Sequence, residues 1–174
     1  SLLARARDLR LVFLIPDGTN EFMANLGAAI TRRAHIVKGE RLTLELHRVR
    51  PLDPEAMVAA LDALEPRTCD SAVIVATDDD AVRQAVDAAS RRGVAVVTLV
   101  SDLPGSARRL FIGVDNAAAG RTAASLLGRF CPRGKVGVIA GSLGLRDHRE
   151  RLEAFTTLLH DEFPALEVLG PAEG

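Results

Sequence analysis

The chain has 174 residues, of which 48% are apolar, and its formal net charge is -1. This length allows one domain with a proper core, or one lobe and part of another, and the apolar content excludes a disordered chain. The near-neutral charge gives no support for a nucleic-acid-binding surface, and no apolar run reaches the roughly 18 residues that a membrane-spanning helix needs.

The first informative segment is the apolar run Leu11–Ile15, which is followed by the turn sequence Pro-Asp-Gly and then by a helical pattern. An unbroken apolar run bounded by turn residues is typical of a strand that is buried on both faces. Its carboxyl end would place Thr19, Asn20 and Phe22 in the crevice where open α/β sheets bind their ligands. Asn20 and Phe22 are therefore candidate binding residues.

Strand and helix patterns alternate along the rest of the chain. Further strands are predicted at residues 42–47, 72–76, 94–100, 110–114, 136–140 and 167–169, and helices at 20–34, 53–64, 78–92, 117–130 and 146–163. Gly93 is expected to end one helix and Asn116 to cap the start of the next. Because parallel strands require crossover connections, this order predicts a parallel sheet with helices on both faces.

The acidic triplet 78–80 follows the predicted strand 72–76. Carboxylates at such a turn could form a metal or phosphoacceptor site, but they also cap free amides and favour the helix dipole, which is the preferred interpretation. Asp78 stays a candidate because it lies at the carboxyl edge of a central strand. The sequence has no dinucleotide-binding glycine motif, and it predicts no catalytic residue, metal site or cofactor. Cys69 and Cys131 lack metal or disulfide spacing, which fits a reducing cytoplasm.

Two later segments place polar groups at the ends of predicted strands. Residues 96–105 carry Ser101 and Asp102 directly after one strand, and residues 141–155 carry several cations after another. Within the second segment Arg151 lies one helical turn before Phe155, an apolar anchor that would fix the depth of the cation.

Four segments together resemble the effector-binding region of LacI-type transcriptional regulators, which share their fold with periplasmic sugar-binding proteins. These segments are 11–23, 96–105 (VVTLVSDLPG), 111–124 (FIGVDNAAAGRTAA) and 135–155. The resemblance implies a fold of the periplasmic-binding-protein-like I class, with two α/β lobes and a sugar or similar polar metabolite between them. We then expect residues 1–9 to be the remnant of a linker, 10–115 to form the first lobe, and 116–174 to form a partial second lobe.

The resemblance also implies roles for individual residues. Asn20 and Phe22 match the asparagine and aromatic group that follow the first strand, although Glu21 and Met23 depart from the family pattern. Ser101 and Asp102 are the nearest matches to an acid that contacts ligand hydroxyls after the fourth strand. The arginine four residues before the helix phenylalanine matches Arg151, and two further candidates lie near it, Arg146 and His148. Arginine and carboxylate groups of this kind bind hydroxyls or carboxylates, as in a polyol or an acid sugar.

These observations favour a non-enzymatic, cytoplasmic domain that senses a sugar or polyol in a LacI-type regulator. Such a protein is expected to be a homodimer, to have no membrane partner, and to contact operator DNA only through an absent N-terminal headpiece. The alternative is a periplasmic sugar-binding protein of an ABC transporter. A third possibility is an enzyme on a flavodoxin-like sheet that uses Asp78 or Asp102 with a metal.

Overall fold

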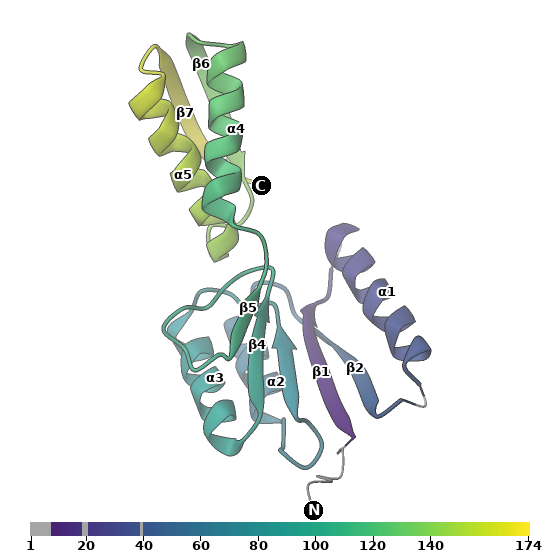
Figure 1. Cartoon of the computed structure of the whole chain (residues 1–174). Coiled ribbons are helices and arrows are strands. Elements are labelled where there is room, and N and C mark those ends of the chain that lie inside the picture. The colour runs from purple at the N-terminus through teal and green to yellow at the C-terminus, as the bar shows by residue number, and fades with distance from the viewer. Residues whose placement is uncertain (1–7, 19–20, 39) are drawn as a thin grey trace, which may run out of the picture. The chain divides into compact units, whose positions relative to one another are not determined.

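The computed structural model describes residues 8–18, 21–38 and 40–174, and the chain divides into two compact units (Figure 1). The first unit ends at Ile112, and the second comprises Gly113–Gly174. Each unit has a hydrophobic core of its own. The predicted binding residue Asn20 and most of the predicted linker remnant lie outside the described residues.

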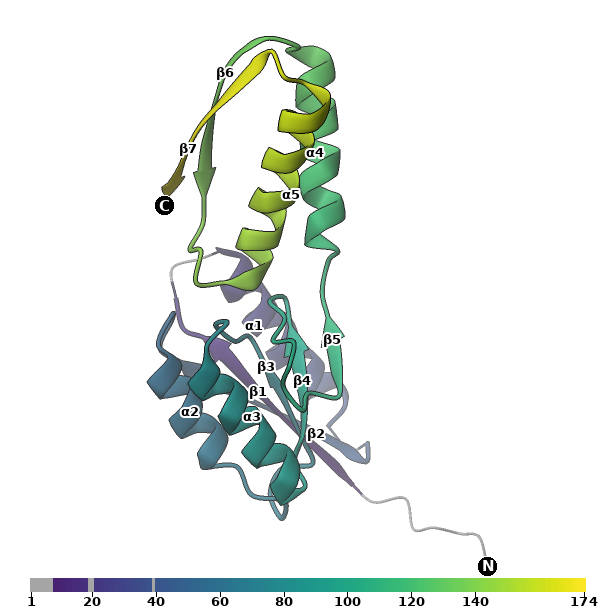
Figure 2. The same ribbon diagram turned by 90° about the vertical axis from the view of Figure 1, so that its left-hand side faces the viewer.

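The first unit is a five-stranded parallel sheet with the strand order β2-β1-β3-β4-β5. Helix α1 lies on one face of this sheet, and α2 and α3 lie on the other (Figures 1 and 2). This arrangement confirms the predicted α/β class, a parallel sheet flanked by helices. The elements are β1 (Leu9–Pro16), α1 (Glu21–Ile36), β2 (Leu42–Val49), α2 (Pro54–Asp62), β3 (Ser71–Ile74), α3 (Asp80–Arg92), β4 (Ala95–Leu99) and β5 (Leu110–Ile112).

The main core lies between the sheet and the helices α2 and α3. Val12, Ala72 and Val96 stand in register on three adjacent strands, and each is at most 2% exposed. They belong to one cluster with the fully buried helix residues Leu61 and Val86. Because each buried aliphatic side chain contributes about 1.5–3 kcal/mol, this layer holds the strand ends in fixed positions.

The helix boundaries of the first unit follow local chemistry. Asp53 caps α2 by accepting a hydrogen bond from the Ala56 amide at 3.0 Å. Asp79 caps α3, which confirms a capping role within the acidic triplet. The same helix ends at Gly93, whose φ of 97° is the left-handed conformation expected of a C-terminal cap.

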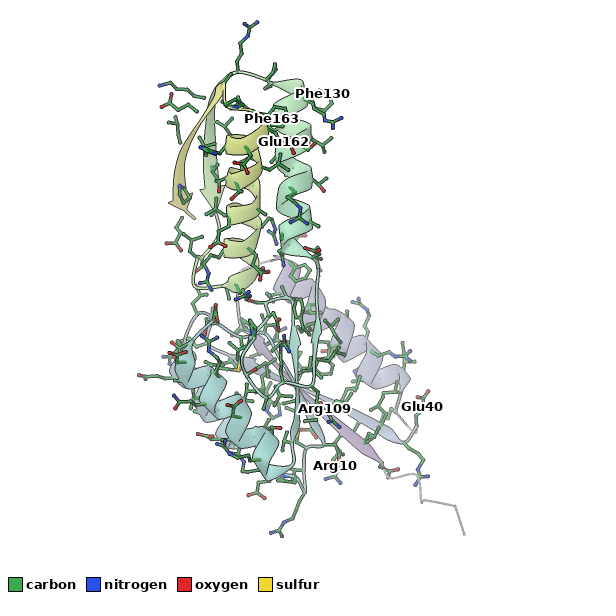
Figure 3. All side chains as sticks on the ribbon, turned by 60° about the vertical axis from the view of Figure 1, so that its left-hand side comes forward. Arg10, Glu40, Arg109, Phe130, Glu162 and Phe163 are labelled. Atoms are coloured by element: carbon green, nitrogen blue, oxygen red, sulfur yellow. The ribbon has the colours of Figure 1, made fainter. Side chains whose placement is uncertain are left out.

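The second unit contains α4 (Asn116–Phe130), β6 (Gly134–Ala140), α5 (Arg146–Glu162) and β7 (Leu166–Glu173). The strands β6 and β7 are parallel, and α4 packs against α5 along its length (Figure 3). The buried residues of this core are Ala124, Leu159 and Leu166. Phe155 and Phe163 pack against them from α5 and its end.

The start of α4 differs from the sequence prediction. The N-terminal cap is Asp115, whose Oδ1 accepts a hydrogen bond from the Ala118 amide at 2.8 Å. The prediction that Asn116 caps this helix was wrong, because the carboxylate of the preceding Asp115 already does so. Asn116 instead directs its side chain to α5 and forms part of the site described below.

Over residues 8–18, 21–38 and 40–174, none of the helices combines the length and apolar content needed to cross a membrane.

Candidate functional site

The strand order of the first unit reverses between β1 and β3, and ligands of open α/β sheets bind beside such a switch point. Asp17 and Gly18 follow β1, and Phe22 lies in the first turn of α1 with 56% of its surface exposed. On the β3 side, the Oγ1 atom of Thr77 is buried and has no hydrogen-bond partner among the described residues. The carboxyl edge of β1 and β3 therefore carries the exposed ring of Phe22 and the buried hydroxyl of Thr77. Thr77 was not predicted from the sequence.

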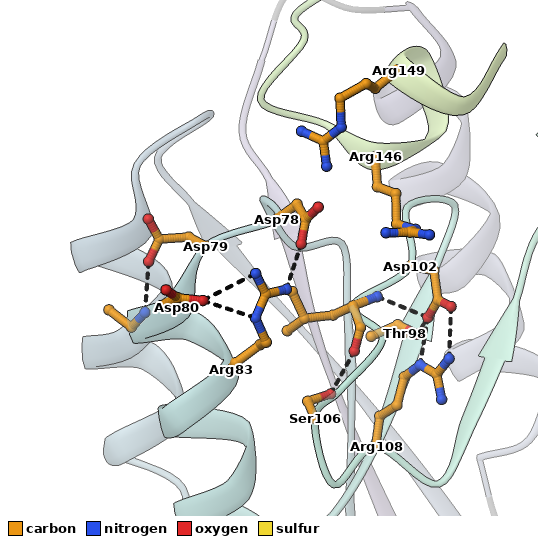
Figure 4. Close-up of polar contacts among 12 residues, drawn as sticks. Asp78, Asp79, Asp80, Arg83, Thr98, Asp102, Ser106, Arg108, Arg146 and Arg149 are labelled. Carbon is orange, nitrogen blue, oxygen red and sulfur yellow. Dashed lines mark hydrogen bonds and ion pairs between the residues drawn. The ribbon is translucent and has the colours of Figure 1, made fainter. Parts of the chain in front are cut away.

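Asp78 is tied to the first turn of α3. Its Oδ1 pairs with Nη1 of Arg83 at 2.5 Å, and Arg83 also contacts Asp80 at 3.1 Å (Figure 4). The hydrogen bond that Arg83 donates to Asp78 is the main reason that the pKa of Arg83 is raised. The structure thus gives Asp78 a role in orienting Arg83, and its predicted contact with a ligand stays a prediction.

Asp102 anchors the loop between β4 and β5. Its carboxylate accepts hydrogen bonds from Thr98 Oγ1 at 2.9 Å, from the Leu103 amide at 2.8 Å, and from two nitrogens of Arg108 at 2.5 and 2.7 Å (Figure 4). Burial would raise the pKa of Asp102, but the hydrogen bonds from Arg108, Thr98 and Leu103 outweigh it and lower the pKa below its ordinary value. The neighbouring Ser101 is fully buried, and its Oγ has no hydrogen-bond partner within the described chain.

The second unit contains a hollow of about 430 Å³ between α4, β6 and α5. One end is polar and includes His148 and Arg151, and the remainder is mainly apolar. The lining residues are Gly120, Ala123, Leu127, Val136, Gly137, Val138, Ile139, Ala140, Gly141, His148, Arg151, Leu152 and Phe155. This combination of an apolar wall and a few polar groups is typical of small-molecule sites.

The guanidinium of Arg151 is held in place at the polar end. Its Nε and Nη2 donate to Oδ1 of Asn116 at 3.2 and 2.6 Å, and Nη2 lies 3.9 Å from Oδ2 of Asp147. Asn116 and Asp147 are only 3% and 5% exposed, whereas the Arg151 side chain is 49% exposed. Asn116 takes two of the five N–H donors, so the half-exposed guanidinium retains donors for an outside acceptor.

His148 and Arg146 were predicted near Arg151, and the two side chains have different partners. The Nε2 of His148 lies 3.5 Å from Oδ2 of Asp147, and its ring rests against Gly141, where a Cβ would come within 2.3 Å of it. The Nδ1 of His148 is buried and without a hydrogen-bond partner in the described structure. Arg146 pairs instead with Glu150 at 2.7 Å. The structure therefore brings His148 and Arg151 together around Asp147.

Gly120 fixes the backbone of α5 at the same point. A Cβ at Gly120 would lie 2.2 Å from the carbonyl oxygen of Arg151, so only glycine permits this close approach of α4 and α5. The backbone of Arg151 is thereby held from one side while Asn116 holds its guanidinium.

Asn116 and Asp147 are site residues that were not predicted from the sequence. Asp147 carried a usable signal, because a carboxylate four residues before an arginine shares its helix face. Asn116 carried none, since its contact with Arg151 spans 35 positions of sequence. Over the part of the chain that the structure describes, no three His, Cys, Asp or Glu side chains are grouped as a metal ion would require.

Solved structures similar to the chain share its fold. An ABC transporter solute-binding protein from Burkholderia graminis, in complex with D-arabinose, is 23% identical, with a TM-score of 0.83 over 97% of this chain and 57% of that protein. One from Clostridium phytofermentas with bound L-rhamnose is 14% identical, with a TM-score of 0.82 over 97% and 53% of the two chains. A protein from Bacteroides fragilis described as a LacI transcriptional regulator is 16% identical, with a TM-score of 0.83 over 96% and 61%.

The chain thus spans little more than half the length of these proteins. No curated protein sequence matches it. The family profile described as the periplasmic binding protein domain matches residues 11–174, which is nearly the whole chain. This match confirms the predicted periplasmic-binding-protein-like fold and the expectation of a binding domain rather than an enzyme. The chain belongs to the periplasmic binding protein domain family.

Proposed function

We propose that the chain binds a sugar or polyol and is part of a solute receptor that serves an ABC transporter. The observation that carries the proposal is the guanidinium of Arg151, which buried Asn116 holds at the polar end of an otherwise apolar hollow. An arginine fork binds neighbouring hydroxyls, and the ring of Phe155 in the same hollow suits an apolar sugar face.

The nature of the similar proteins supports the transport role. The structures from Burkholderia graminis and Clostridium phytofermentas are ABC transporter solute-binding proteins with bound sugars. An arabinose-binding protein from Geobacillus stearothermophilus is also similar, with a TM-score of 0.73. A receptor of this kind would work outside the cytoplasmic membrane, and it would deliver its sugar to a membrane partner.

A second candidate function is the effector domain of a LacI-type regulator. It is supported by the similarity to the Bacteroides fragilis protein and by the sequence segments 96–105 and 111–124. A regulator would be cytoplasmic and dimeric and would carry a DNA-binding headpiece. The gene upstream of this segment distinguishes the two, because a receptor requires a secretion signal there and a regulator requires the headpiece.

Thermal unfolding of the full-length gene product, with D-arabinose, L-rhamnose and a panel of other neutral sugars, polyols and uronates, tests the binding proposal. A bound sugar at about 100 times its dissociation constant adds roughly 2.7 kcal/mol to the free energy of unfolding. Because Arg151 supplies charge-assisted hydrogen bonds, Arg151→Ala should weaken binding about 10- to 100-fold.

The matched control is Arg129→Ala, which removes an exposed arginine from the last turn of α4 and should leave sugar binding unchanged. The proposal fails if no member of the panel stabilises the protein, or if Arg151→Ala responds like the parent protein.

A further inference from the structure

We propose that Asn116 is a positioning residue that fixes the guanidinium of Arg151 and connects it to the segment by which the chain enters the second unit. Both the oxygen and the nitrogen of its side-chain amide form hydrogen bonds. Oδ1 accepts from Nε and Nη2 of Arg151, and Nδ2 donates to the carbonyl of Val114 at 3.1 Å. The inference rests on the proposed role of Arg151 as the direct ligand contact.

Asn116 is not needed for the local structure in which it lies. The start of α4 is already capped by Asp115, and the core of the unit is built from Ala124, Leu159 and Leu166. Yet Asn116 is 3% exposed, and a buried amide is costly unless its hydrogen bonds are made. Its burial is therefore accounted for by the bonds to Arg151 and Val114.

The contacts of Arg151 leave it little conformational freedom. Gly120 of α4 lies against its backbone carbonyl, Asn116 holds Nε and Nη2, and the carboxylate of Asp147 faces Nη2. A side chain that is ordered before binding loses less entropy when the ligand arrives. Asn116 thus contributes to affinity without touching the ligand.

Val114 gives this contact a second consequence. The boundary between the two units lies at Ile112 and Gly113, so the Val114 carbonyl belongs to the first residues beyond it. A ligand that moves the guanidinium of Arg151 also moves this segment, because Asn116 is hydrogen-bonded to both. Because linkage is reciprocal, a change in the segment must also change the affinity at Arg151.

The experiment compares Asn116→Asp, which keeps an acceptor for Arg151, with Asn116→Leu, which has similar size and no acceptor. The first measurement is exchange of the Arg151 Nε–H proton with water by ¹⁵N NMR. We expect the exchange rate of this proton to rise about tenfold or more in Asn116→Leu, because losing a hydrogen bond to a charged group changes an equilibrium by about this factor. In Asn116→Asp the exchange rate should stay near the parent value.

The second measurement is amide hydrogen exchange at residues 114–117. Arg151→Ala should accelerate it, and Asn116→Leu should add nothing further in that background. The positioning role is overturned if Asn116→Leu leaves the Nε–H exchange unchanged, or if its cost to stability is equal with and without Arg151. Should Asn116→Leu fail to fold, Asn116→Ala provides the same comparison.

Binding of D-arabinose and L-rhamnose separates the two proposals. If neither these sugars nor the wider panel binds while the exchange results hold, the proposed function fails and the positioning role stands. If sugar affinity depends on Arg151 but is unchanged in Asn116→Leu and Asn116→Ala, the positioning role fails and the function stands.

Discussion

Asp102 lies in a loop whose backbone conformation is unusual, because Val100 has a φ of 68° two residues earlier. A β-branched residue in the left-handed region is strained and persists only where neighbouring contacts fix it. The contacts of Asp102 with Thr98, Leu103 and Arg108 provide that restraint. The polar groups after β4 are therefore placed by an ion pair rather than by the strand alone.

This ion pair predicts a specific pH dependence of stability. The folded-state pKa of Asp102 lies below its ordinary value, so the carboxylate contributes stability above about pH 4 and loses it as the pH falls through the folded-state pKa. In Asp102→Asn, the decrease in the free energy of unfolding between about pH 5 and pH 2 should be smaller than in the parent protein. Urea unfolding at a series of pH values measures the difference.

The control for this measurement is Asp8→Asn, which alters an exposed pair with Arg41 and should leave the acid dependence close to that of the parent protein. Equal acid sensitivity of Asp102→Asn and the parent protein would contradict the assigned role of the ion pair.

The predictability of the site from sequence differs from residue to residue. Arg151 was predicted because the resemblance to LacI-type regulators implies an arginine four residues before the helix phenylalanine, here Phe155, and its contact with a ligand stays a prediction. Asp102 was predicted because it follows a buried strand, and its ligand contact stays a prediction; its observed partner Arg108 depends on how the loop folds back. Asn116 was assigned to capping, since asparagine is a frequent cap and sequence gives no measure of which of two adjacent acceptors occupies that position.

At the level of elements, the packing of α4 on α5 depends on small residues spaced four apart, Gly120, Ala124 and Gly128. Cβ atoms at the two glycines would meet the Arg151 carbonyl at 2.2 Å and the ring of Phe163 at 2.4 Å. This stripe lets the helices approach closely and brings Arg151 to the start of α4.

Gly120→Ala should therefore destabilise the second unit, although alanine favours helices. Overpacking against a backbone carbonyl costs about 1–3 kcal/mol, which exceeds the gain of about 1 kcal/mol in helix propensity. The control is Gly137→Ala in β6, where a Cβ meets no atom within 4 Å. Chemical denaturation followed by far-ultraviolet circular dichroism compares them, and equal stability of the two variants would contradict the packing argument.

The order and type of the elements were predictable because apolar runs and helical spacing alternate clearly along the chain. The exact ends of the helices and strands were less predictable. The predicted strand 94–100 is Ala95–Leu99 in the structure, since its pairing stops where Val100 turns into the loop. The helix predicted from Asp53 to a point before Pro66 likewise ends early, at Asp62, with Ala63 as its C-terminal cap.

For the molecule as a whole, the two units differ in how much apolar surface they bury. The first has a continuous layer beneath α2 and α3, whereas the core of the second, over its described residues, contains three buried apolar side chains. Within the described residues β6 pairs only with β7, and Ile139 on it is 82% exposed. A two-stranded sheet on two helices is a marginal arrangement, so in the 174-residue chain the second unit should be the less stable.

Hydrogen exchange of the 174-residue chain tests this order of stability. Amides of β1, β3 and β4 should exchange at least about tenfold more slowly than those of α4 and α5. The reason is that the part of a protein with the least buried apolar surface opens at the lowest free energy. Equal protection of the two sets would indicate that the chain opens as one cooperative body.

The separate cores also determine how the protein can be observed. The chain has six phenylalanines and contains neither tryptophan nor tyrosine, so it is nearly silent in intrinsic fluorescence. A single tryptophan introduced into one core would give that unit an optical signal of its own against a dark background. Ligand arrival and the melting of each half then become separately visible by light alone.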